Sequence, residues 1–120
     1  MKLKTQKPSK KDVADAAYSD ICLCCEFREH LKLDFEGTAD WRHELTHRYP
    51  HDSRNYVAAD ELARLAGTIE QVPDKLMERL VKFWNADGEA ASMRQSEMMR
   101  SVGFGADYKN AAEFLRELMR

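Results

Sequence analysis

The chain has 120 residues and a mass of 13.9 kDa, which suits one domain and is too short for two. Apolar residues make up 43% and charged residues 33%, so the composition excludes a fibrous, low-complexity or wholly disordered chain. The longest apolar run, residues 21–25, is far shorter than the roughly 18 residues that a membrane span requires. These values predict a single domain that is not inserted in a membrane.

Charge is distributed unevenly along the chain. The formal net charge is −2 and the five lysines within residues 1–11 contribute +5, so residues 12–120 carry −7. A lysine block with no apolar stretch after it predicts a disordered tail and argues against a secretory signal. Because nucleic-acid binding depends on neutralising phosphates, the acidic body makes nucleic acid an unfavourable partner. The three cysteines crowd into residues 22–25, which argues against a disulfide framework and favours a cytoplasmic compartment.

Hydrophobic periodicity predicts an all-α domain, a bundle of five or six short helices within residues 12–120. Pro73 stands where a first-turn proline belongs, and the helix after it has the strongest amphipathic pattern. Met93 is predicted to face the core of the bundle. Apolar residues recur at helical spacing in the segments 12–25, 40–49, 53–67, 73–86, 90–102 and 107–120.

One short segment, residues 31–35, has two interpretations. Leu31, Leu33 and Phe35 alternate with charged residues, as in a short strand. The same segment also continues a helical i+4 spacing that starts at Phe27. The sequence leaves both structures open and predicts that the glycine and threonine at positions 37 and 38 interrupt the chain before the next helix.

All seven cysteines and histidines lie within residues 22–51, and this concentration is the strongest chemical signal in the sequence. In the first of two overlapping patterns, Cys22 and Cys25 form a C-x2-C pair. After seventeen intervening residues, His43 and His47 form an H-x3-H pair. The arrangement resembles a Cys2His2 zinc finger, which implies that these four side chains bind a structural zinc ion.

The second pattern is the complete H-E-x-x-H of residues 43–47. It resembles the zincin metallopeptidase signature, which implies its two histidines as zinc ligands and Glu44 as the general base. The third ligand would be His51 or Glu61. The chain departs from that signature at Pro50, which ends the predicted helix soon after the second histidine.

A third interpretation has no metal, and it is the one that we expect. The cysteines are then buried core side chains, because cysteine is among the residues most often found inside proteins. The H-E-x-x-H side chains lie with Arg42 on a solvated helix face. The core stripe of that helix is predicted to be Trp41, Leu45 and Tyr49.

Residues 60–67 resemble the opening of a helix-turn-helix, which implies a DNA-binding regulator. Pro73, however, falls inside the segment that would form the recognition helix. Glu70, Asp74 and Glu78 would face the phosphates there. This function therefore ranks below the others.

Taken together, these features predict a small helical interaction or regulatory protein that binds another macromolecule through an exposed helical face. The expected partner is another protein, and self-association is left open. We expect no cofactor and no catalysis. A zinc protein, either structural or hydrolytic through Glu44, is the main alternative, and a DNA-binding regulator is the third.

Overall fold

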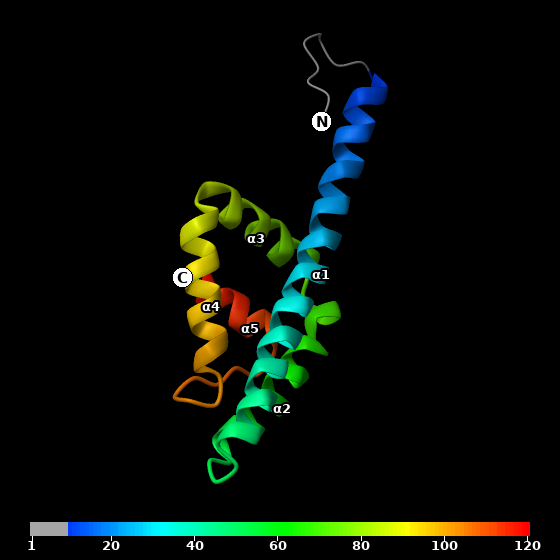
Figure 1. The fold of residues 1–120 in the computed structure, drawn as a ribbon. Helices are drawn as coiled ribbons and strands as arrows, with labels where there is room; N and C mark the ends of the chain where they lie inside the picture. The colour runs from blue at the N-terminus through cyan, green and yellow to red at the C-terminus, as the bar shows by residue number, and fades with distance from the viewer. Residues whose placement is uncertain (1–9) are drawn as a thin grey trace.

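The computed structural model describes the backbone of residues 10–120 and the side chains from residue 23 onward. The predicted all-α fold is confirmed: the described part consists of five α-helices and one short 3-10 helix, η1 (Figure 1). Among these residues, the only extended pairing is an isolated bridge between Val102 and Ala106. In chain order the elements are α1 (Lys10–Arg48), α2 (Arg54–Ala66), η1 (Ile69–Gln71), α3 (Asp74–Ala86), α4 (Gly88–Ser101) and α5 (Ala111–Leu118).

The first helix, α1, differs from the predicted order of elements. The sequence predicts two shorter helices with an interruption at Gly37, whereas α1 continues unbroken through this glycine. The segment 31–35 is therefore helical and not extended. The predicted tail, residues 1–11, lies outside the described residues except for Lys10 and Lys11, which begin α1.

Packing explains why α1 is continuous. Leu31, Phe35 and Ala39 follow one another at i+4 spacing and are buried, with exposed fractions of 2%, 0% and 8%. A glycine within a helix costs only about 1 kcal/mol relative to alanine. Burying one large apolar side chain contributes about 1.5 to 3 kcal/mol. The stabilisation from burying Leu31 and Phe35 is therefore larger than the cost of Gly37 within the helix.

The later helices begin at residues that suit helix starts. Pro73 directly precedes α3, as its position in the sequence predicts. Asp87 caps α4 by accepting a hydrogen bond from the backbone N–H of Ala90 at 3.1 Å. Asn110 caps α5 in the same way, accepting from the backbone N–H of Glu113 at 2.9 Å.

In Figure 1, α2 lies alongside the lower part of α1, while α3, α4 and α5 lie together to one side of this pair. The rings of Phe35 and Phe114 meet edge to face in the core, with centroids 4.9 Å apart. Met93 is 67% exposed, so the prediction that it faces the core is wrong. The largest fully buried side chains are Phe35, Leu62, Leu65, Ile69, Met77, Leu80, Met99, Val102, Phe114, Leu115 and Leu118.

The loop between α4 and α5 approaches α2 closely at Gly103. This glycine has a φ of +80°, in the region that other residues rarely adopt. A Cβ atom at this position would lie 2.8 Å from the Cβ of Ala58. A glycine is therefore needed at position 103 for two reasons: the positive φ and the lack of space for a side chain beside Ala58.

Candidate functional site

The structure does not bring the four side chains of the Cys2His2 pattern together. Cys25 and His43 lie on the same continuous helix, eighteen residues apart, which corresponds to about 27 Å along the axis. A zinc ion needs all its ligand atoms within about 2.0 to 2.3 Å. Cys25 is exposed and Cys24 is half-buried, so the prediction of buried core cysteines is wrong for Cys25. The side chain of Cys22 lies outside the described part.

The H-E-x-x-H residues lie on the last two turns of α1, where both histidines and Glu44 are exposed. The rings of His43 and His47 stack with centroids 6.4 Å apart, and His43 also meets the ring of Tyr56 on α2 at 5.9 Å. This is the helical placement that the pattern implies. Through the described ranges, no group of three or more His, Cys, Asp or Glu side chains is placed to hold a metal ion.

The two candidates for a third zinc ligand are separate from this histidine pair. His51 lies in the turn after α1 and is exposed. Glu61 lies on α2, where its carboxylate pairs with the guanidinium of Arg64 at 2.8 Å. Neither residue joins the two histidines in a ligand group.

Arg42 is buried, with an exposed fraction of 8%, although the sequence pattern predicts it on a solvated face. Its guanidinium donates to Asn55 Oδ1 at 3.0 Å and to the backbone carbonyl of Arg100. It also lies over the ring of Phe104, 4.0 Å from the centroid, and Arg54 lies over the same ring at 5.1 Å. Burial and the neighbouring charge of Arg100 lower the pKa of Arg42.

While Arg42 is buried, two of the three residues of the predicted core stripe are exposed and Leu45 is half-buried. Trp41 is 43% exposed and Tyr49 is 59% exposed, so their predicted places in the core are wrong. The physical reason is the orientation of α1, which is set by Leu31, Phe35 and Ala39 and turns Trp41 outward.

A line of three residues follows the exposed side of α1. Leu33 is 54% exposed, and Gly37 lies at i+4 spacing from both Leu33 and Trp41. A Cβ atom built on Gly37 would have no other atom within 4 Å. Next to this line is a groove of about 330 Å³, which Ser96 and Arg100 of α4 border on the other side. We call it the α1/α4 groove.

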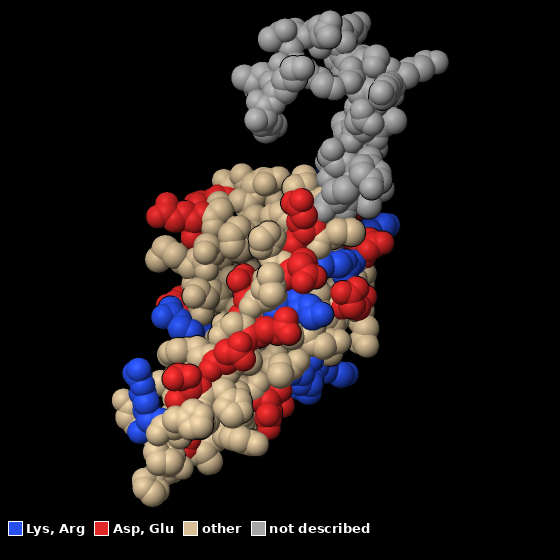
Figure 2. Space-filling model, turned by 45° about the vertical axis from the view of Figure 1, so that its right-hand side comes forward, with Lys and Arg blue, Asp and Glu red and all other residues tan. Residues whose placement is uncertain are grey.

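Acidic side chains lie beside this line on the face of α1 turned away from α4. Glu29, Glu36, Asp40 and Glu44 recur at helical spacing and are all exposed, so they form one stripe. Figure 2 shows acidic side chains along this face of the molecule, with lysines and arginines among them. We call these four residues the acidic stripe. Arg100 is the only lysine or arginine that lines the α1/α4 groove itself.

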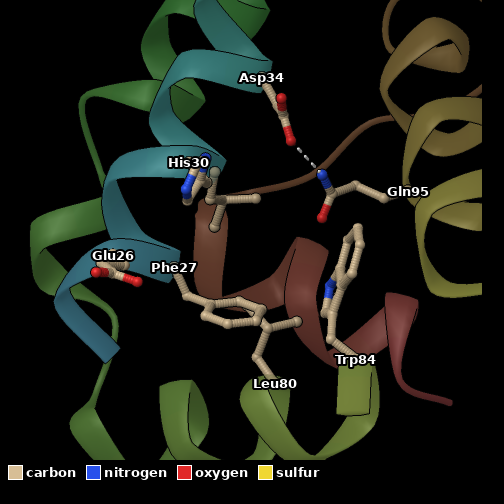
Figure 3. A pocket seen from close by; sticks show the side chains of 8 residues that line it. Glu26, Phe27, His30, Asp34, Leu80, Trp84 and Gln95 are labelled. Atoms are coloured by element: carbon tan, nitrogen blue, oxygen red, sulfur yellow. Dashed lines mark hydrogen bonds between the residues drawn. The ribbon is translucent and has the colours of Figure 1, made fainter. Parts of the chain in front are cut away.

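A second hollow, of about 310 Å³, lies between α1, α3 and α4 (Figure 3). Gln95 Nε2 donates to Asp34 Oδ2 at 2.8 Å on one side of it. Burial raises the pKa of Asp34, while the hydrogen bond from Gln95 and the nearby His30 act in the opposite direction. We call this hollow between α1, α3 and α4 the Trp84 pocket. Its lining consists of Glu26, Phe27, His30, Leu31, Asp34, Leu80, Trp84 and Gln95.

Sequence reasoning missed both hollows. The i+4 pattern places Trp41 in the core and leaves Leu33 in an undecided segment. The available signal was Gly37, a glycine within a helical pattern and midway between two large apolar residues. No comparable signal marks the Trp84 pocket, because its residues come from three helices whose packing cannot be read from spacing.

The helix-turn-helix pattern falls on α2 and α3, which are separated by η1 and Pro73. The exposed positions at the start of α3 carry both signs of charge, with Asp74 beside Lys75 and Glu78 beside Arg79. Asp74 pairs with Arg28 of α1 at 2.6 Å. The element that would read DNA thus presents mixed charges.

Comparisons with protein-family models, with curated proteins and with solved structures find no match to this chain. Across residues 10–120, no helix combines the length and the apolar character that a membrane crossing needs. A further hollow of about 540 Å³ lies between residues 23–28 of α1 and α3 and is lined by both Arg28 and Asp74. Function is therefore inferred from two of the chain's own surfaces, the α1/α4 groove and the Trp84 pocket.

Proposed function

We propose that this chain is an interaction protein whose α1/α4 groove binds a basic amphipathic helix of another protein. The observation that supports this function is the exposed line of Leu33, Gly37 and Trp41. Leu33 and Trp41 are two large apolar side chains that stay exposed on one face of α1, about 12 Å apart along the helix axis. Apolar residues that share an exposed face can serve as anchors for a partner. Tryptophan is also enriched among the residues that dominate binding energy.

The shape of the groove favours a helix as its occupant. Helices that bind in grooves use apolar anchors spaced three or four residues apart. Leu33 and Trp41 offer apolar contacts on both sides of Gly37, where the missing side chain lets a partner approach the backbone of α1. Ser96 of α4 is small as well and keeps the opposite border low.

The charge beside the groove favours a basic occupant. The acidic stripe lies along the same helix as Leu33 and Trp41, and residues 12–120 carry −7 overall. Complementary charge speeds association and selects the orientation of a partner. A helix with lysines or arginines on one flank would place them against this stripe.

The same charge argues against a second copy of this chain as the occupant. A symmetric contact through α1 would bring two acidic stripes together, and like charges across an interface cost several kcal/mol. The proposal therefore commits to a different protein with a basic helix.

Selection from a displayed library of helical peptides tests this function with the full chain. We expect the wild type to enrich peptides that have apolar residues at i and i+4 and a basic flank. Leu33→Gln should weaken the selected peptides at least tenfold, because it removes one apolar anchor and keeps a good helix former. Val57→Gln is the matched control, since Val57 is also 54% exposed but lies on α2.

Three results would overturn the proposal. The first is equal loss of binding in the Leu33 and Val57 variants, and the second is enrichment of peptides without a basic flank. The third is a dimer in sedimentation equilibrium that Leu33→Gln dissociates, which would make a second copy the occupant. Affinity that falls as salt rises supports the proposal, because salt screens exposed charges.

A further inference from the structure

We propose that the Trp84 pocket binds a small organic ammonium ion, with Phe27 and Trp84 as two walls of an aromatic cage and Asp34 as the counter-charge. The pocket shares only Asp34 with the lining of the α1/α4 groove. The two proposals can therefore fail separately.

Two aromatic side chains from different helices form one corner of the pocket. Phe27 of α1 and Trp84 of α3 have ring centroids 6.1 Å apart and an interplanar angle of 72°. Both rings are only partly buried, so each still borders open space (Figure 3). Aromatic faces attract cations, and such rings surround quaternary ammonium ligands in known recognition sites.

The polar groups of the lining also suit a cation. Its formally charged side chains are the carboxylates of Glu26 and Asp34, and no lysine or arginine is among the lining residues. In Figure 3, the amide nitrogen of Gln95 points toward Asp34 and its oxygen lies on the side of Trp84. A bound group would thus meet carboxylate and carbonyl acceptors beside aromatic faces. The imidazole of His30 also lines the pocket.

Asp34 is exposed as a residue, although neighbouring atoms partly desolvate its carboxylate. Within the described part of the chain, its recorded side-chain partner is Gln95, and none of the ion pairs joins it to a lysine or arginine. Burial accordingly raises the pKa of Asp34. An ammonium ion in the pocket would replace the missing solvation by direct attraction. The volume, about 310 Å³, is at the small end of ligand pockets and limits the ligand to a few heavy atoms.

The experiment uses choline as the probe and 3,3-dimethylbutan-1-ol as its neutral analogue of the same shape. Binding to the full chain is followed by heteronuclear NMR, with the indole N–H signal of Trp84 identified in a Trp41→Phe background. We expect choline to shift this signal saturably and to bind at least about tenfold more tightly than the alcohol. Asp34→Asn should reduce choline affinity at least tenfold, because it removes the charge and keeps the shape.

Asp40→Asn is the matched control, since it removes an exposed carboxylate of the same helix that lies outside the pocket. It should leave choline affinity unchanged, as should Leu33→Gln. Trp84→Leu provides a second test if Asp34→Asn fails to fold, and it should abolish the preference for choline over the alcohol. Equal binding of the two probes to the wild type, or shifts centred on the acidic stripe, would overturn the proposal. The same holds for a folded Asp34→Asn variant that binds choline as the wild type does.

Discussion

The inner face of α1, which packs against the other helices, and its outer face, which is exposed to solvent, have similar residues and opposite roles. Leu31 and Leu33 are the same residue type two positions apart, yet their exposed fractions are 2% and 54%. Trp41 is exposed while the next residue, Arg42, is buried. Residue type alone therefore does not decide burial on this helix. The orientation of α1 does, and it separates a face that holds the fold from a face that is free to bind.

The largest effect is expected from the inner face. Phe35→Ala should lower the free energy of unfolding by about 3 to 5 kcal/mol, because it empties a fully buried site beside Phe114. Leu33→Ala should change it by less than about 0.5 kcal/mol. Denaturant unfolding of both variants measures this difference. If both variants lowered the free energy of unfolding by similar amounts, Leu33 would contribute to the core and the distinction between the two faces of α1 would be wrong.

A second test concerns the buried arginine. Arg42→Met keeps an apolar stem but leaves Asn55 Oδ1 and the carbonyl of Arg100 without this donor. Each buried group left without a partner costs about 1 to 3 kcal/mol, so the variant should unfold at clearly lower denaturant concentration. Arg48→Met, at the exposed end of the same helix, is the control and should have little effect. A stable Arg42→Met variant would mean that Arg42 is not required on the inner face.

Glycine substitutions should give a smaller effect with opposite signs at two positions. Gly37→Ala should raise the free energy of unfolding by about 0.5 to 1 kcal/mol, because the added methyl group meets open space within a helix. Gly103→Ala should lower it, because φ is +80° and the new Cβ would meet Ala58. Thermal unfolding of both variants checks the signs. A loss of stability in Gly37→Ala would place that residue against a neighbour and close the groove.

The smallest change in stability is expected when zinc is added, because the two histidines of the H-E-x-x-H pattern lie on the exposed face of α1. His43 and His47 are two exposed ligands, so adding zinc should leave the thermal midpoint nearly unchanged in wild type and in His47→Ala. Elemental analysis after dialysis against a weak chelator provides an independent measurement. About one zinc ion per chain would contradict this expectation. Glu44→Gln and Cys22→Ser would then distinguish a hydrolytic site, which needs the glutamate, from a structural one, which needs the cysteine.

Much of the fold could be predicted because helix ends carry local signals. Pro73 acts within one turn of chain, so its effect can be read from the sequence. The caps Asp87 and Asn110 are equally local signals that the apolar periodicity overlooks, so the last helix is predicted from residue 107 whereas α5 begins at Ala111. The continuity of α1 could not be predicted, because Gly37 is a local signal for a break. Burial of Phe35 against Phe114, which lies far along the chain, overrides that signal.

The candidate sites were harder to predict than the fold. The sequence drew attention to cysteines and histidines because of their chemistry, and the structure separates Cys25 from His43 along one continuous helix. The groove and the pocket depend instead on what lies across from α1. Ser96 and Gln95 of α4 complete them, and their distance from α1 follows from tertiary packing alone.

The contact of two arginines with Phe104 has a consequence for how the chain folds. Arg42 belongs to α1, Arg54 begins α2, and Phe104 lies in the loop after α4, so the cluster joins the α1/α2 pair to a loop fifty residues further along the chain. Contacts of such long sequence separation form late, because the intervening loop must close first. The inner face of α1 is thus complete only when the final third of the chain has arrived. A chain emerging from the ribosome would hold Arg42 unburied until Phe104 is synthesised.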